Sequence, residues 1–292
     1  MNRIKGILYA AVSSSTFGLA PFFSITLLLA GFSAFEVLSY RWGVASIVLI
    51  VFGWLSGCNF RLAGKDWGVV FLLSLLRAVT SFSLIIAYQN IASGVASTIH
   101  FMYPLAVALA MMFFFREKKS LLVILAVLMS LLGAALLSLG ELEAKSGNTM
   151  VGLVAACVSV FSYAGYIVGV RTTRAVQINS TALTCYVMGL GTIFYLIGAY
   201  CTSGLQLVSD GYTWLIILGL ALPATAMSNI TLVQAIKYAG PTLTSILGAM
   251  EPLTAVVIGV FVFKELFTVN SAVGIILILL AVSIVVFRRQ KS

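Results

Sequence analysis

The amino-acid sequence predicts an all-α integral membrane protein, in which ten transmembrane helices form two inverted five-helix repeats. Of the 292 residues, 61% are hydrophobic and 9% are charged, whereas a soluble domain carries roughly 25% charged residues. The apolar residues form long runs separated by short polar stretches. One long stretch of the sequence also recurs after a constant interval, which indicates an internal duplication.

A helix needs about 20 mostly apolar residues to cross a bilayer, and the sequence contains ten runs of this kind. The predicted spans lie near residues 5–29, 34–57, 66–90, 93–115, 119–140, 149–171, 179–203, 211–237, 240–263 and 268–287. These runs are too long and too uniformly apolar for barrel strands, so the backbone groups must be paired within helices.

The basic residues of the loops predict that both termini are cytoplasmic, in a multi-pass protein of the cytoplasmic (inner) membrane. With a cytoplasmic N-terminus, the opposite side carries only Lys145 and Lys264. The cytoplasmic side carries Arg3, Lys5, Arg61, Lys65, Arg116, Lys118, Lys119, Arg171, Arg174, Lys237, Arg288, Arg289 and Lys291. Because Lys and Arg concentrate in cytoplasmic loops, this distribution also favours an even number of spans.

Several functional classes are disfavoured by the composition. The net charge of +9 does not indicate nucleic-acid binding, because the basic residues lie between apolar runs. Four cysteines without paired spacing and a single histidine, His100, supply no metal-ligand cluster. The sequence has no P-loop pattern for ATP, and we expect no cofactor. Without a cluster of nucleophile, base or metal ligands at one membrane face, an integral membrane enzyme is disfavoured. The short loops disfavour a receptor.

The duplication is clearest between Ala87–Ser120 and Ala235–Thr268, which align without a gap at a shift of 148 residues. Within this alignment, the Met-Tyr-Pro sequence at 102–104 matches the Met-Glu-Pro sequence at 250–252. Tyr103 therefore occupies the position that corresponds to Glu251.

Each half contains five spans, so the second half must enter the membrane from the opposite side. The expected repeats are residues 1–143 and 148–292, with the polar stretch Gly140–Thr149 around their junction. Inverted repeats are typical of secondary transporters, whose substrate site lies near the bilayer midplane at the repeat interface.

Polar residues at helical spacing predict that spans 1, 3, 4, 6, 8 and 9 surround a substrate path. Spans 5 and 10 are nearly all aliphatic and are expected to face lipid or a second protomer, so a monomer and a homodimer both remain open. Small and hydroxyl residues also hold helices together without any substrate, which is the alternative explanation for each single Ser or Thr.

Charged residues within the spans are the main candidates for substrate contact, because a charge near mid-membrane costs roughly 2.5–3.5 kcal/mol. Arg77 lies near the middle of span 3 and Glu251 near the middle of span 9. An ion pair between the two is the structural alternative. Arg41 lies closer to the end of span 2, and we expect it to extend to the outer surface.

Two prolines predict bends within the spans. Pro252 cannot donate a hydrogen bond to the carbonyl of Gly248, and Pro104 has the same effect one repeat earlier. We expect Pro104, Pro252 and Gly248 to form hinge or gating positions beside a polar path, where an unpaired carbonyl is tolerated.

The duplicated pattern resembles the drug/metabolite transporter superfamily, EamA type, over the whole chain. The best-matched stretches are "MEPLTAVVIGVFVFKELFT" and its weaker partner "MYPLAVALAMMFFFREKKS", in which Tyr103 replaces the glutamate. The resemblance implies ten helices in two inverted halves and the movement of small metabolites, often the export of amino acids or related compounds.

These observations together predict a secondary transporter that exports amino acids or related metabolites by alternating access. Arg77 is expected to face a carboxylate and Glu251 an ammonium group, with Glu251 or His100 as candidates for proton coupling or exchange. The expected apolar contacts are Tyr163, Tyr166, Phe17 and Tyr103, and Tyr88 and Asn229 complete the predicted site. A transporter of organic anions or nucleotide-linked sugars is the alternative, because arginines outnumber acidic residues within the spans. An integral membrane enzyme or a receptor is a remote alternative.

Overall fold

A computed structural model describes residues 2–91, 93–117, 120–138, 147–202, 204–254 and 269–288. Throughout this part of the chain the regular structure is helical and contains no strand. Seven helical segments are long and apolar enough to cross a membrane, and two shorter apolar helices occupy the positions of spans 5 and 10. The remaining span, the ninth, extends beyond Thr254 and lies partly outside the described residues. The all-α membrane fold is thus confirmed.

The helices of the first half follow the predicted spans within a few residues. They are α1 (Asn2–Phe17), α2 (Ala20–Leu29), α3 (Ala34–Leu55), α4 (Trp67–Asn90), α5 (Ser93–His100), α6 (Tyr103–Phe113) and α7 (Leu121–Ser138). The start of α3 is fixed by a capping box, in which Ser33 and Glu36 each accept a hydrogen bond from the other's backbone N–H.

The second half continues with α8 (Thr149–Thr172), α9 (Ser180–Cys201), α10 (Gly211–Ala221), the π-helical turn η4 (Leu222–Met227), α11 (Ser228–Ala239), α12 (Pro241–Leu247) and α14 (Val269–Arg288). Three of these helices begin at short polar residues that accept a backbone hydrogen bond, namely Asn148, Asn179 and Asp210. The hydrogen bond from the Thr213 backbone N–H lowers the pKa of Asp210, which is consistent with its capping role.

Spans 1, 4, 8 and 9 are each interrupted within the described residues. The interruptions are Gly18–Leu19, Phe101–Met102, the π-helical turn, and Gly248–Ala249, after which helix resumes at Met250. The breaks in spans 4 and 9 lie at closely corresponding repeat positions, just before Pro104 and Pro252, because proline is tolerated in the first turn of a helix but not in its interior. The predicted breaks are present, and their role as hinges stays a prediction.

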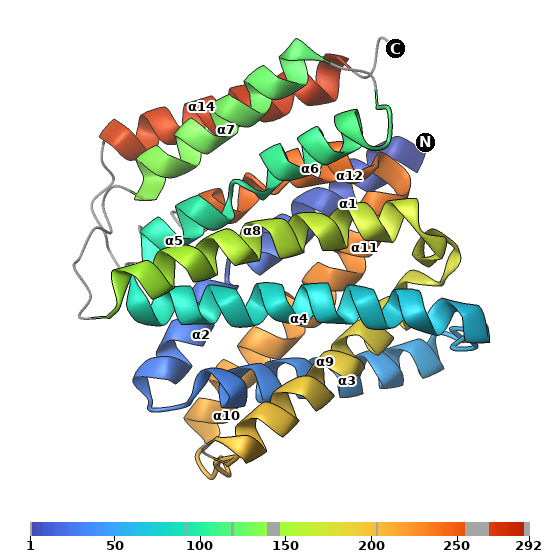
Figure 1. Ribbon diagram of the computed structural model, residues 1–292, viewed down its shortest axis with the longest axis vertical. Coiled ribbons are helices and arrows are strands. Elements are labelled where there is room, and N and C mark those ends of the chain that lie inside the picture. Colours follow the sequence, from blue (N-terminus) through green and yellow to red (C-terminus); the bar gives the residue numbers. More distant parts are fainter. Residues whose placement is uncertain are drawn as a thin grey trace.

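Helices of the two halves pack against one another throughout the described part of the bundle (Figure 1). The helix pairs that pack most extensively are α4 with α8, α7 with α14, α1 with α11, and α3 with α9, and each pair joins one half to the other. At a shift of 148 residues, α4 corresponds to α10–α11 and α8 corresponds to α1–α2. The α4–α8 pair of one half-to-half contact is therefore equivalent to the α11–α1 pair. In each of the other two pairs the two helices correspond to one another, α3 to α9 and α7 to α14, as expected for an approximate two-fold relation between the halves.

Helix directions agree with inverted repeats. The start of α1 lies against the end of α11, because a Cβ atom on Gly6 would meet Ala239 at 2.8 Å, and Ser13 donates a hydrogen bond to the carbonyl of Ser228. The α4–α8 pair is also antiparallel, with Leu73 close to Gly169. Figure 1 shows the start of α1 and the end of α14 on the same side of the bundle, in agreement with an even number of spans.

Helices α7 and α14 form a peripheral pair at one edge of the bundle, separated from α4 by α5, α6 and α8 (Figure 1). Their outward side chains include Leu125, Leu128, Ile276 and Leu279, which are about half exposed. The predicted position of spans 5 and 10 outside the polar centre agrees with this arrangement. Most of the largest buried cluster comes from the other helices, chiefly α3, α4, α8, α9, α10 and α11, and α14 contributes only Ile278 among its buried members.

Candidate functional site

The guanidinium group of Arg77 lies at the centre of this bundle, with 1% of the residue exposed. Its position depends on the close packing of α4 and α8. Gly165 and Gly169 lie one turn apart on α8, and Leu76 and Leu73 of α4 fill the space above them. Glycines at this spacing let two membrane helices approach closely. Arg77, next to Leu76, consequently reaches the polar side chains in the interior.

Arg77 is held by one amide, one hydroxyl and three aromatic rings. Its Nε donates to Asn229 Oδ1 at 3.0 Å, and its Nη1 lies 3.5 Å from Ser81 Oγ. The guanidinium carbon is 4.9, 5.3 and 5.9 Å from the ring centroids of Tyr163, Phe17 and Tyr166 respectively. A buried cation gains about 0.5–2 kcal/mol from each such ring, which offsets part of the cost of its burial.

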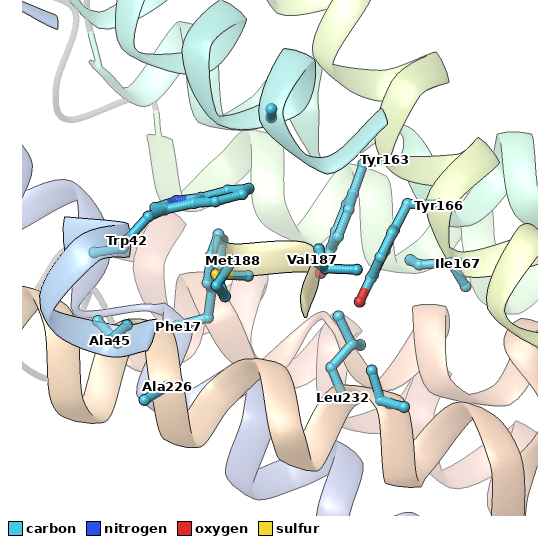
Figure 2. Packing of buried hydrophobic residues seen from close by; sticks show 14 of the residues in the cluster. Phe17, Trp42, Ala45, Tyr163, Tyr166, Ile167, Val187, Met188, Ala226 and Leu232 are labelled. Atoms are coloured by element: carbon cyan, nitrogen blue, oxygen red, sulfur yellow. The ribbon is translucent and has the colours of Figure 1, made fainter. Parts of the chain in front are cut away.

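The aromatic residues of the site come from three different spans. Figure 2 shows the rings of Tyr163 and Tyr166 side by side and nearly parallel, and their centroids are 6.5 Å apart. Phe17, at the end of α1, stacks on Tyr163 at 6.5 Å, and Tyr103 meets the same ring edge-on at 4.6 Å. The structure therefore brings together all four aromatic residues that were predicted to contact the apolar part of a substrate.

Glu251 joins this cluster through Tyr103, whose hydroxyl donates to Glu251 Oε1 at 3.3 Å. The two residues are 148 positions apart, so each occupies the other's place in the repeat, and their contact puts both near the axis that relates the halves. The described contacts of Arg77 and Glu251 do not include a salt bridge between them. The structural alternative of a direct ion pair is therefore not what holds these residues in the membrane.

His100, at the end of α5, borders the same cluster. Its Nδ1 lies 2.8 Å from Ser159 Oγ, and its ring stacks on Tyr163 with centroids 5.4 Å apart. The Nε2 atom is buried and has no hydrogen-bond partner among the described residues. The Tyr166 hydroxyl is also buried without a partner. Buried polar atoms usually find a partner, so these two atoms are available to a ligand.

Arg41 does not extend to the outer surface, and that prediction was wrong. Only 4% of the residue is exposed, its Nε donates to Thr225 Oγ1 at 2.6 Å, and its guanidinium carbon lies 5.6 Å from the Phe17 ring centroid. The short span of sequence between Arg41 and the helix start suggested an easy route to the surface. The structure instead places α3 against η4, whose π-helical turn presents Thr225 to the arginine.

The π-helical turn is a feature of the site that the sequence reasoning missed. Such turns occur often at functional sites. Here the Thr225 hydroxyl donates to the carbonyl of Leu220, five residues earlier, and Asn229 Nδ2 donates to the carbonyl of Thr225. The same turn thereby orients the partners of both Arg41 and Arg77. Pro223, in the middle of span 8, was the sequence signal that could have indicated it.

Two predictions about the helix breaks need correction or refinement. The Gly248 carbonyl is not left unpaired by Pro252, because it accepts a hydrogen bond from the Glu251 N–H at 2.9 Å. It therefore does not by itself indicate a water-filled path. Gly248 does have a clear steric role, since a Cβ atom there would lie 1.7 Å from the Tyr103 hydroxyl. Likewise, a Cβ atom on Gly18 would lie 2.6 Å from the carbonyl oxygen of Glu251.

Tyr88 is not brought into the Arg77 cluster by this structure. It packs in a separate buried group with Leu84 and Ile91, and its hydroxyl contacts Ser97 at 3.3 Å. Its predicted substrate contact remains untested. In the described part of the chain, no three His, Cys, Asp or Glu side chains gather in a way that could hold a metal ion.

Comparison with known proteins gives the family. The EamA-like transporter family matches this chain twice, over residues 4–139 and 150–287. An uncharacterized transporter from Archaeoglobus fulgidus is 28% identical over 238 residues, which cover 80% of this chain and 83% of that protein. A protein crystal structure matches the fold with a TM-score of 0.79 and 17% identity, covering 97% of this chain and 96% of the other. The chain therefore belongs to the EamA-like transporter family of the drug/metabolite transporter superfamily, and is a multi-pass membrane transporter of small molecules rather than an enzyme.

Proposed function

We propose that this protein is a secondary transporter that exports amino acids or related small metabolites across the cytoplasmic (inner) membrane by alternating access. The observation that carries the proposal is Arg77, a buried cation at the interface of the two halves, whose described contacts are an amide, a hydroxyl and aromatic rings. Its Nη donors are available for a bidentate contact with a carboxylate. A substrate carboxylate would supply the missing negative charge.

Glu251 supports a substrate that also carries an ammonium group. The carboxyl lies beside Tyr103, and Tyr103 packs on Tyr163, which in turn contacts Arg77. Cationic and anionic groups thus lie at different sides of one aromatic cluster. That arrangement matches the two ends of a zwitterion, and the rings offer apolar contacts to the rest of the molecule.

The burial of the site supports alternating access. Arg77, Tyr103, Tyr163, Tyr166 and Asn229 are each at most 3% exposed. A substrate can reach such a site only if helices move apart, first on one side of the membrane and then on the other. The predicted hinge positions lie at the helix breaks of spans 4 and 9 or just after them, next to the site, where such movement would require few changes in packing.

The proposal is tested by counterflow of labelled amino acids into liposomes that contain the purified protein. The wild-type protein is expected to exchange internal unlabelled for external labelled amino acid. Arg77→Ala should reduce this exchange about 100-fold or more, because it removes one partner of a buried charge pair. Arg77→Lys should recover little of it, since the planar two-pronged donor is lost.

Arg61→Ala is the matched control, because Arg61 is exposed in the loop between α3 and α4 and belongs to the same residue type. This variant should exchange amino acids at the wild-type rate. Wild-type exchange by Arg77→Ala, in protein that is folded and inserted, would contradict a role for Arg77 in binding. The absence of any amino-acid exchange by the wild-type protein would contradict the proposed cargo.

Organic anions, including nucleotide-linked sugars, are the second candidate cargo. The observation in favour is that two buried arginines, Arg41 and Arg77, lie against the Phe17 ring, whereas Glu251 is the acidic residue of the site. Exchange of nucleotide-linked sugars, together with an absence of exchange of zwitterions, would support this candidate over amino acids.

A further inference from the structure

Arg41 is a second buried cation at the site, and the amino-acid hypothesis assigns it no partner. Its Nε is bound by the neutral hydroxyl of Thr225. Its Nη2 is buried and has no hydrogen-bond partner among the described residues. An arginine of which 4% is exposed and whose buried Nη2 has no partner calls for a ligand, because leaving such a donor unpaired is costly.

The charges around Phe17 are unbalanced in the absence of a ligand. The guanidinium groups of Arg41 and Arg77 lie 5.6 and 5.3 Å from the centroid of this one ring. Two cations so placed in a low-dielectric interior repel each other. The carboxyl of Glu251 contacts Tyr103 rather than either arginine. An anionic group between the two arginines would remove this repulsion and accept a hydrogen bond from the unpaired Nη2 of Arg41.

We propose that Arg41 binds a second anionic group of the substrate, so that the cargo is an amino acid with an acidic side chain. This inference rests on the proposed function, in which Arg77 holds the α-carboxylate and Glu251 the ammonium group. A substrate with two anionic groups and one ammonium group matches the two arginines and one glutamate of the site. Carboxylate and phosphate ester side chains share this chemistry.

The positions of the two guanidinium groups favour a small molecule of this kind. Because both guanidinium groups lie near the same aromatic ring, the distance between them is limited to about twice their distance from its centroid, a separation that one substrate with two anionic groups could bridge. The unpartnered hydroxyl of Tyr166, whose ring is 5.9 Å from the Arg77 guanidinium carbon, adds a donor near the anionic end. The Thr225 hydroxyl accepts from Arg41 and donates to the Leu220 carbonyl, so it acts as a positioning residue.

The experiment compares glutamate, glutamine and O-phosphoserine as counterflow substrates of the full chain in liposomes. Glutamate and glutamine differ in the charge of the side chain but hardly in size. The wild-type protein is expected to prefer one of the two anionic amino acids to glutamine by about tenfold or more, which corresponds to one well-formed charged contact. The ratio between glutamate and O-phosphoserine identifies the anion as carboxylate or phosphate.

Arg41→Gln is expected to reverse this preference, because the amide can pair with glutamine but offers no charge to glutamate. Arg41→Lys is the second variant. It keeps the charge and should weaken glutamate exchange several-fold, since the forked donor is lost. Arg61→Gln removes an exposed arginine and should leave the substrate ratio unchanged. Binding of glutamine by Arg41→Gln, measured as a thermal shift, shows that this variant is folded.

Two results would overturn the inference while leaving the proposed function in place. The first is a wild-type protein that exchanges neutral amino acids in an Arg77-dependent manner and rejects both anionic ones. The second is an unchanged substrate ratio in both Arg41 variants. A wild-type protein that exchanges no amino acid at all would instead refute the proposed function, and this inference with it.

Discussion

Replacement of Gly248 by alanine is expected to destabilise the protein, because the added Cβ atom would lie too close to the Tyr103 side chain and, at 2.8 Å, to the backbone carbonyl oxygen of Ser245. The added Cβ atom would lie 1.7 Å from the Tyr103 hydroxyl oxygen and 2.9 Å from Tyr103 Cζ. Both distances are well below van der Waals contact, so the tyrosine must move. It has little freedom to do so, because it is 2% exposed and its ring packs 4.6 Å from that of Tyr163.

The expected cost follows from the two interactions that would be disturbed. Overpacking of a buried side chain typically costs about 1–3 kcal/mol. Displacement of the Tyr103 hydroxyl also weakens its hydrogen bond to Glu251, and a bond to a charged group contributes about 1.5–3 kcal/mol. The alanine regains up to about 1 kcal/mol by restricting the unfolded chain. We therefore expect a net loss of about 2–4 kcal/mol.

A double-mutant cycle with Tyr103→Phe isolates this contact. The unfolding of the wild type, Gly248→Ala, Tyr103→Phe and the double variant would be measured in the same detergent. Phenylalanine lacks the oxygen that clashes at 1.7 Å and leaves only the longer approaches, at 2.9 Å to Cζ and at 2.8 Å to the Ser245 carbonyl oxygen. The double variant should thus be more stable, by about 1–2 kcal/mol, than the sum of the two single losses predicts.

Gly189→Ala supplies the control, because a Cβ atom at Gly189 of α9 would meet nothing within 4 Å. This variant should be at least as stable as the wild type, since alanine favours a helix more than glycine does. Wild-type stability of Gly248→Ala would refute the steric argument. Strict additivity of the Gly248 and Tyr103 variants would show that the loss has a different origin.

Further predictions concern Glu251 and the loop between α9 and α10. Glu251→Gln should weaken substrate binding and flatten the pH dependence of counterflow. Pro252→Ala should instead leave binding largely intact and slow exchange. If Glu251→Gln keeps the wild-type affinity and the wild-type pH profile, the carboxyl is neither a ligand nor a proton carrier. Glu36→Gln should lower the unfolding free energy by about 1.5–3 kcal/mol, because Glu36 accepts from the backbone N–H groups of Ser33 at 2.8 Å and Gln206 at 2.7 Å and an amide nitrogen cannot accept. Thermal unfolding and limited proteolysis of the α9–α10 loop would check this prediction. A wild-type unfolding temperature and a wild-type rate of cleavage in this loop would contradict it.

The helices of this protein could be predicted well because hydropathy and turn residues determine them locally. The α3 and α9 boundaries, for example, follow from Ser33 and Asn179 as helix caps. The interruptions could be predicted only in part. Pro104 and Pro252 indicated breaks in spans 4 and 9. The break at Gly18, however, lies where the Glu251 backbone comes close, and neighbouring residues in the sequence do not predict that approach.

The site was predictable to the extent that charge in a membrane span is informative. Arg77, Tyr163 and Asn229 were selected for their residue types, and they are in contact or joined through Arg77. Arg41 was misjudged, because its depth was inferred from its distance along the chain from the helix end. Its actual surroundings depend on the packing of α3 against a π-helical turn, whose Thr225 lies 184 residues away from Arg41 in the sequence, and such a contact requires the folded structure.

The meeting of Tyr103 and Glu251 has a consequence for how the duplicated gene could diverge. Residues that face their own counterparts across a two-fold axis cannot change independently. Two copies of the second half would bring two glutamates together, and like charges at close range cannot both remain ionised. A phenol opposite the carboxyl removes that conflict by donating a hydrogen bond. The pair therefore makes the two halves chemically different, because in a chain made from two identical second halves the two carboxyls could not both be ionised at this point.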